Sequence, residues 1–168
     1  MNKKTFCLLL GILLALGGLV ACKKTDEKPP ANTTPVDQLI QAGKSPITIG
    51  ALVKGISPVA PTFRVTVENV SDAPIKLING SVVFFEENGK ALADAIQEAG
   101  YTDLSPIPAG GKIELSLIAA DEKAVSGKWI IKDVIYEKPN PVDKLYGNLS
   151  YKWTNPNFEA ELAAEKNK

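Results

Sequence analysis

The chain has 168 residues, of which 45% are hydrophobic, and its 19 basic side chains equal its 19 acidic ones in number. It contains no histidine, which excludes catalysis by a Ser-His-Asp triad and metal sites built on histidine. The near-neutral charge, with Arg64 as the single arginine, also excludes the basic surface by which proteins bind nucleic acid.

The first 21 residues are typical of a bacterial secretory signal peptide. Lys3 and Lys4 precede a short apolar run from Phe6 to Val20 that contains three glycines. A basic start, a brief apolar stretch and a small residue before the cleavage site define such a signal, which is removed from the mature protein. The residues around the cleavage site resemble the lipobox of bacterial lipoproteins: Leu19, Val20, Ala21 and Cys22.

The lipobox resemblance implies a lipid at Cys22. A diacylglyceryl group is expected on its sulfur, with cleavage after Ala21 and acylation of the new amino group. Two or more acyl chains anchor a protein stably, so we expect permanent attachment to a membrane through this lipid. Lys23 stands where an aspartate retains many lipoproteins at the inner membrane, which favours the outer membrane if the organism has one. Cys7 leaves with the signal, so the mature chain has no disulfide and no free thiol.

Residues 22–45 are predicted to form a flexible tether between the lipid and the folded domain. The stretch from Lys23 to Pro35 is rich in charge and proline, a composition that buries too little apolar surface to offset the entropy of ordering. A short helix is predicted from Val36 to Ala42, and Gly43 is its expected stop.

Residues 46–154 carry the pattern of short β-strands. A first β segment spans residues 47–53, and residues 62–68 alternate with a period of two, which marks a half-buried strand. Phe63, Val65 and Val67 are expected to face the core. Further strands are predicted in four segments that proline and glycine turns separate: 75–86, 113–117, 129–136 and 145–153.

Some positions between and within these strands are irregular. The dipeptide Asn79-Gly80 predicts either a tight hairpin turn or a bulge. The segment from Ala93 to Ala99 favours one or two helical turns, and Pro106 then breaks regular structure. The alternation in residues 129–136 slips near Lys132-Asp133, which indicates a β-bulge.

About seven short strands separated by turns predict an all-β fold, an immunoglobulin-like antiparallel sandwich. Residues 155–168, rich in alanine and charge, are expected to form a short exposed helix or a frayed tail. The predicted organisation along the chain is therefore a signal peptide (1–21), a lipidated tether (22–45), a sandwich domain (46–154) and a C-terminal tail (155–168).

Three motifs in the middle of the chain share the spacing of a known domain family. A strand ends in Asn69 to Ile75 (Asn-Val-Ser-Asp-Ala-Pro-Ile), a second ends in Phe84 to Gly89 (Phe-Phe-Glu-Glu-Asn-Gly), and a Pro-Ala-Gly turn follows at Pro108. Together, over residues 60–120, these motifs resemble FxLYD-type immunoglobulin-like domains. The resemblance implies a small extracytoplasmic sandwich that binds or spaces partners and is not an enzyme.

Aromatic and acidic side chains in the last two strands are candidates for contact with a ligand. Trp129 and Trp153 are expected in the core, and Tyr151 shares the strand face of Trp153. Tyr146 is expected to point to the opposite face and is the predicted exposed contact ring. Asp133 interrupts an apolar strand. An edge-strand charge or a bulge residue explains it better than a ligand contact does.

The leading hypothesis is a membrane-anchored, non-catalytic lipoprotein without catalytic residues, metal or cofactor. Its sandwich is expected to bind a protein partner, or to space an assembly, at the bacterial cell envelope. Two alternatives stay open. One is a surface-exposed adhesin that binds host or matrix ligands. The other is a small-ligand carrier or envelope enzyme, which a deep apolar pocket with convergent polar groups favours.

Overall fold

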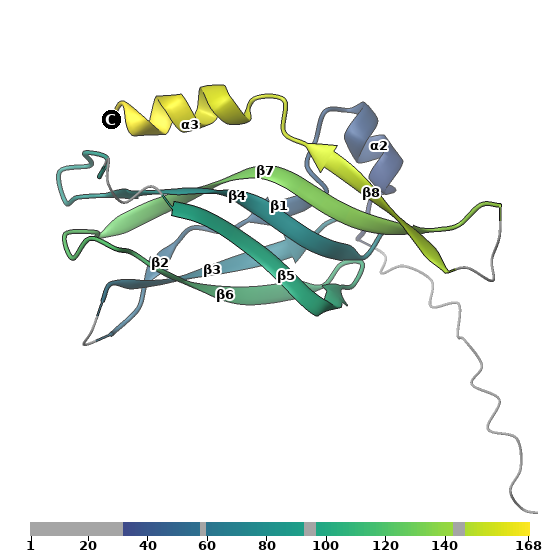
Figure 1. Ribbon diagram of the computed structural model, residues 1–168, viewed down its shortest axis with the longest axis horizontal. Coiled ribbons are helices and arrows are strands. Elements are labelled where there is room, and N and C mark those ends of the chain that lie inside the picture. Colours follow the sequence, from purple (N-terminus) through teal and green to yellow (C-terminus); the bar gives the residue numbers. More distant parts are fainter. Residues whose placement is uncertain (1–31, 58–59, 93–96, 143–146) are drawn as a thin grey trace, which may run out of the picture.

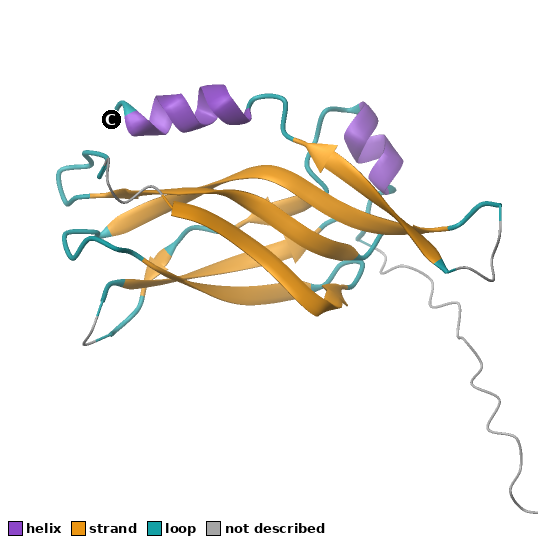
Figure 2. Ribbon diagram, viewed as in Figure 1, coloured by secondary structure: helices purple, strands orange, loops and turns teal. Residues whose placement is uncertain are grey.

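The computed structural model describes residues 32–57, 60–92, 97–142 and 147–168 (Figure 1), without the side chains of residues 103 and 104. The strands of these residues form two four-stranded sheets in which all neighbouring strands are antiparallel. The two sheets lie face to face, and one helix lies along the outer surface of the second (Figure 2). The all-β antiparallel sandwich predicted from the sequence is therefore confirmed.

The first sheet is built around β3 (Thr62–Asn69). One edge of β3 pairs with β6 (Lys112–Ile118) along its whole length. The other edge is shared by two short strands, β1 (Ile47–Ile49) and β2 (Val53–Lys54), so these two act as one interrupted edge strand.

The second sheet has the order β5-β4-β7-β8. Its strands are β4 (Ile75–Phe85), β5 (Gln97–Ile107), β7 (Ser126–Pro139) and β8 (Asn148–Thr154). With β1 and β2 counted as one strand, the sandwich has seven strands among the described residues. The interrupted edge strand β1–β2, β3 and β6 form one sheet, and β5, β4, β7 and β8 lie in that order in the other. This distribution of the strands is a Greek-key order of the immunoglobulin type.

Alternation along β3 fills the core between the sheets. Phe63, Val65 and Val67 are at most 1% exposed, as the period-two pattern predicts. The ring of Phe63 packs on that of Phe84 from the other sheet, with 5.1 Å between centroids. Burial of these apolar side chains from both sheets supplies the main favourable free energy of the fold.

A β-bulge lies in β7, where the sequence indicates one. Asn79 pairs with Asp133 and Gly80 pairs with Ile131, so Lys132 is the extra residue. β4 runs without a break through Asn79 and Gly80. Of the two structures predicted for this dipeptide, a hairpin turn and a bulge, the bulged pairing is therefore the one present. Gly80 is not among the positive-φ glycines of the described chain, so it lacks the backbone of a tight hairpin turn.

The helical turns predicted from Ala93 to Ala99 are wrong for residues 97–99, which begin β5; residues 93–96 lie outside the described residues. The predicted break at Pro106 is also wrong, because β5 continues to Ile107. β5 is an edge strand, and its pairing with β4 jumps from Thr102 to Ile107. A proline without an N–H fits at such an irregular edge.

The folded domain begins earlier in the chain than the boundary at residue 46 suggested by composition. The short helix predicted near residues 36–42 is present as α2 (Val36–Gln41), followed by Gly43 at φ +67°. Val36 and Leu39, three residues apart, are both buried, and the backbone N–H of Val36 donates to the Asp72 carboxylate at 2.9 Å. Two apolar side chains on one helical face thus hold this segment against the sandwich.

The C-terminal segment forms α3 (Phe158–Lys166), which confirms the helix predicted there. It is packed on the sheet rather than exposed, because Phe158 and Leu162 are buried one turn apart. Both belong to a second apolar cluster on the outer face of the β4–β7 pair, which has six members: Val83, Phe85, Ala91, Ile130, Phe158 and Leu162.

A buried amide, that of Asn69, joins two turns at the end of the sandwich where α2 packs. Its Nδ2 donates to the carbonyl oxygens of Ala73 at 2.8 Å, Ile107 at 3.1 Å and Pro108 at 2.9 Å. Its Oδ1 accepts from the backbone N–H of Ser71 at 3.0 Å and from the Ser71 hydroxyl at 2.7 Å. The turn between β3 and β4 and the turn after β5 are thereby held together.

Candidate functional site

Several predicted functional residues lie outside the described residues: Leu19, Val20, Ala21, Cys22 and Tyr146. The signal peptide, the lipid attachment and the exposed contact ring therefore stay predictions. Within the part of the chain that the structure describes, no helix has the length and apolar character needed to cross a membrane.

Asp133 lies next to the bulge but is not its extra residue, because Asp133 pairs with Asn79 and with Thr154, and Lys132 is the unpaired residue. The edge-strand interpretation is wrong, because β7 lies between β4 and β8. The carboxylate accepts a hydrogen bond from the Thr154 hydroxyl at 2.8 Å and pairs with the Lys152 ammonium at 3.1 Å. Burial acts to raise the pKa of Asp133, but these two partners outweigh it and hold the pKa below its usual value. Asp133 thus ties β7 to β8 as a carboxylate.

The aromatic side chains of β7 and β8 divide between the core and the surface. Trp129 and Trp153 are buried, as predicted. Tyr151 shares the strand face of Trp153 but is 37% exposed, and its ring stacks on Tyr136 with 5.8 Å between centroids. Lys138 lies 5.6 Å from the centre of the same ring. Tyr151 is therefore an exposed aromatic residue that sequence reasoning missed, because strand parity gives the face of a side chain and not the extent of the opposite sheet.

Exposed large apolar side chains gather at the opposite end of the sandwich from α2. Ile56 is fully exposed, Ile118 is 61% exposed, Val53 is 57% exposed and Val125 is 39% exposed. We call these four residues the distal tip. Val53 and Ile118 lie at strand ends, Ile56 lies in the segment after β2, and Val125 lies immediately before β7.

Strand pairing and two hydrogen bonds place the four tip residues at the same end of the sandwich. One of these bonds, from the Gly55 N–H to the carbonyl oxygen of Thr62, fixes the residue next to Ile56. Val53 and Ile118 flank the first half of β3, where they are paired with Arg64 and Thr62. The Lys54 ammonium donates to the carbonyl oxygen of Ala124 at 2.8 Å, which brings β2 next to Val125. Each apolar side chain thus comes from a separate part of the chain, and the fold assembles them at one end. Sequence periodicity gives no signal for such a surface.

The described chain begins at the other end of the sandwich. Thr34 forms a bridge with Ser71, just beyond the last residue of β3, whereas the distal tip surrounds the first residues of β3. Figure 1 shows α2 and β2 at opposite ends. A strand of eight residues is about 26 Å long at roughly 3.3 Å per residue, so about this distance separates the start of the described chain from the tip.

Exposed apolar side chains that gather on one surface indicate an interaction site, whereas single exposed ones are common on any protein. Three further exposed large apolar residues, Val142, Leu149 and Tyr151, lie along the β7–β8 pair. Comparisons of the chain with protein-family models, with curated proteins and with solved structures found no match. The candidate site therefore rests on the geometry of the distal tip.

Proposed function

We propose that this protein is a membrane-anchored, non-catalytic lipoprotein of the bacterial cell envelope whose distal tip binds another protein through an apolar surface. Cys22 carries the lipid, residues 23–31 connect it to the domain, and the sandwich presents the tip. The observation that supports this most is the position of the tip, at the end of the sandwich opposite the start of the described chain.

The tip lies at the end of the domain opposite the tether, a position that supports a protein as its occupant, and the cross-linking test below separates a protein from the bilayer. Nine residues, 23–31, lie between Cys22 and the described chain, and at about 3.5 Å each they span at most about 30 Å. A lipid at Cys22 therefore holds the α2 end of the domain within about 30 Å of the membrane, and the tip lies at the opposite end of the domain, about 26 Å from that end. Ile56, fully exposed, is the side chain with most apolar surface to bury in a partner.

The test places a photo-reactive benzoylphenylalanine at Ile56 in the full chain in cells, with Val142 at the β7–β8 hairpin as the matched exposed control. The proposal predicts one cross-linked protein from Ile56 that is absent from Val142. It also predicts that the purified partner binds at least tenfold more weakly to an Ile56→Ser, Ile118→Ser variant than to Val142→Ser. Equal cross-linking at both positions, or a cross-link from Ile56 to lipid, contradicts the proposal.

A further inference from the structure

A groove of about 580 Å³ lies on the outer face of the second sheet, between α3 and the strands β4 and β5. We call it the α3 groove. It is independent of the distal tip. Its lining includes residues from three strands and from α3: Asn79 and Ser81 of β4, Glu98 and Gly100 of β5, Lys132 and Asp133 of β7, and Phe158 and Glu159 of α3.

The floor of the groove is polar and low. Asn79 pairs with Gly100, and Ser81 pairs with Glu98, so the four residues form two adjacent rows across β4 and β5. Gly100 carries no side chain, and a Cβ added there comes within 3.0 Å of the Asn79 amide oxygen. The space above Gly100 is therefore left to the Asn79 amide and to whatever occupies the groove.

Ser81 is a nearly buried polar side chain on the floor of the groove. It is 9% exposed, and within the described chain its hydroxyl makes no hydrogen bond. Among the described residues, Trp129 Nε1 is the side-chain polar atom that is buried without a partner, so the Ser81 hydroxyl still reaches the solvent of the groove. Water or a ligand atom on the floor can therefore satisfy this hydroxyl.

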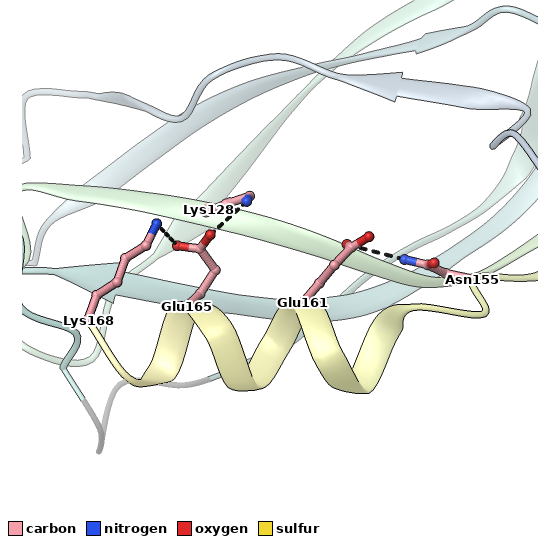
Figure 3. A network of polar contacts seen from close by, with 5 residues as sticks. All are labelled: Lys128, Asn155, Glu161, Glu165 and Lys168. Atoms are coloured by element: carbon pink, nitrogen blue, oxygen red, sulfur yellow. Dashed lines mark hydrogen bonds and ion pairs between the residues drawn. The ribbon is translucent and has the colours of Figure 1, made fainter.

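The walls combine carboxylates with apolar surface. Glu98 stands on β5 and Glu159 on α3, and neither has an ion pair among the described residues. The other acids of α3 are engaged: Glu161 contacts Asn155, and Glu165 binds both Lys128 and Lys168 (Figure 3). The rings and methyl groups of Phe158 and Leu162 line the same space.

Charge within the groove favours a cation. Asp133 pairs with Lys152, and Lys132, which also lines the groove, lies 5.5 Å from the centre of the Phe158 ring. The carboxylates of Glu98 and Glu159 outnumber this one ammonium, so the groove keeps a net negative charge. An ammonium group has three donors for carboxylate and hydroxyl acceptors, and charge-assisted hydrogen bonds are about twice as strong as neutral ones. An apolar chain attached to it meets the Phe158 wall.

We propose that the α3 groove binds a primary ammonium group carried on an apolar chain, with the ammonium between Glu98 and Glu159 above Ser81 and the chain along Phe158 and Leu162. Two sources share this chemistry: a free alkylamine and a lysine side chain of a peptide. The site is a shallow binding site for one cationic group and requires no catalytic step.

The test is an NMR titration of the full mature chain carrying Cys22→Ala, which needs no detergent. The probes are hexylamine, charged at neutral pH, its neutral analogue 1-hexanol, and a lysine capped as an amide at both ends. Hexylamine is expected to give saturable shifts of the backbone N–H signals of Ser81 and Gly100. Saturation by the capped lysine as well assigns the site to protein side chains, and saturation by hexylamine alone assigns it to free amines.

Variants decide whether the carboxylates and the hydroxyl carry the binding. Glu98→Gln combined with Glu159→Gln is expected to weaken hexylamine binding at least tenfold, and Ser81→Ala to weaken it severalfold. Glu87→Gln combined with Glu122→Gln, two exposed acids outside the groove, is the matched control and leaves binding unchanged. Equal binding of 1-hexanol and hexylamine, unchanged affinity in the groove variant, or no saturable shift at Ser81 and Gly100 overturns the proposal.

Discussion

Replacing Asn69 by alanine removes the buried amide that joins two turns, and we expect a large loss of stability. The Asn69 side chain makes five hydrogen bonds, and some of its partners keep another hydrogen bond when the amide is removed. The carbonyl oxygen of Ala73 also accepts from the Ser71 hydroxyl at 3.0 Å, and that of Pro108 also accepts from the N–H of Gly111 at 2.9 Å.

The Ser71 N–H is the group that Asn69→Ala leaves without its side-chain acceptor. A buried donor without a partner costs about 1–3 kcal/mol, and each further hydrogen bond that is lost removes about 1 kcal/mol. The free energy of unfolding should therefore fall by about 2–4 kcal/mol, a large part of the roughly 5–15 kcal/mol by which domains are stable.

The measurement is urea unfolding followed by the fluorescence of the two tryptophans, which are both buried in the fold. Asn88→Ala is the matched control, because Asn88 is exposed and its Oδ1 accepts a hydrogen bond from the N–H of Lys90 in a surface turn. This control should lose less than about 1 kcal/mol. If Asn69→Ala is as stable as Asn88→Ala, the assignment of Asn69 as the residue that joins the two turns is refuted.

Three further predictions concern the sheet and α3. Gly80→Ala should destabilise the fold by more than about 2 kcal/mol, because the added Cβ would lie 2.1 Å from the carbonyl oxygen of Ile130. Gly50→Ala, whose added Cβ has its nearest contact at 3.4 Å, should be tolerated, and thermal unfolding compares the two variants. Trp129→Phe should change stability by less than about 1.5 kcal/mol in urea, because it removes an indole N–H that is buried without a partner in the described fold. Hydrogen bonds from Lys128 and Lys168 lower the pKa of Glu165 in the folded state. The ionised Glu165 therefore stabilises the fold above its unfolded pKa, and this stabilisation is lost as the pH falls through the folded pKa. In acid unfolding, Glu165→Gln should lose less stability below pH 4.5 than the native chain does.

Each of these predictions has an outcome that contradicts it. Equal unfolding temperatures for Gly80→Ala and Gly50→Ala would show that β4 and β7 separate easily at the bulge. A loss clearly above about 1.5 kcal/mol for Trp129→Phe would contradict the expectation that removing this N–H offsets the packing lost with the larger ring. An unchanged acid profile in Glu165→Gln would mean that the two lysines do not hold this carboxylate in solution.

Sequence patterns predicted the features that depend on neighbours along the chain. Alternation placed Phe63, Val65 and Val67 in the core, and its slip at Lys132-Asp133 located the bulge. The predicted stop of α2 at Gly43 follows from the backbone that glycine adopts. These features are local, so composition and period determine them.

Features that depend on distant segments were not predictable in the same way. Gln97 to Ala99 have a helical composition, yet pairing with β4 makes them a strand. The burial of Phe158 depends on apolar residues of β4 and β7 that no local pattern connects to it. The distal tip and the α3 groove arise in the same way, from side chains that only the folded topology brings together.

A lipid at Cys22 is proposed to anchor this domain to a membrane, and every other part of the proposed function depends on that anchor. The most direct measurement is the mass and membrane partition of the protein purified from its own cells, beside a Cys22→Ala variant. We expect the native protein to begin at residue 22, to carry the added mass of its acyl chains and to fractionate with membranes. The Cys22→Ala variant should carry no acyl chain and should not fractionate with membranes. If both proteins are soluble and unacylated, the anchored lipoprotein is contradicted.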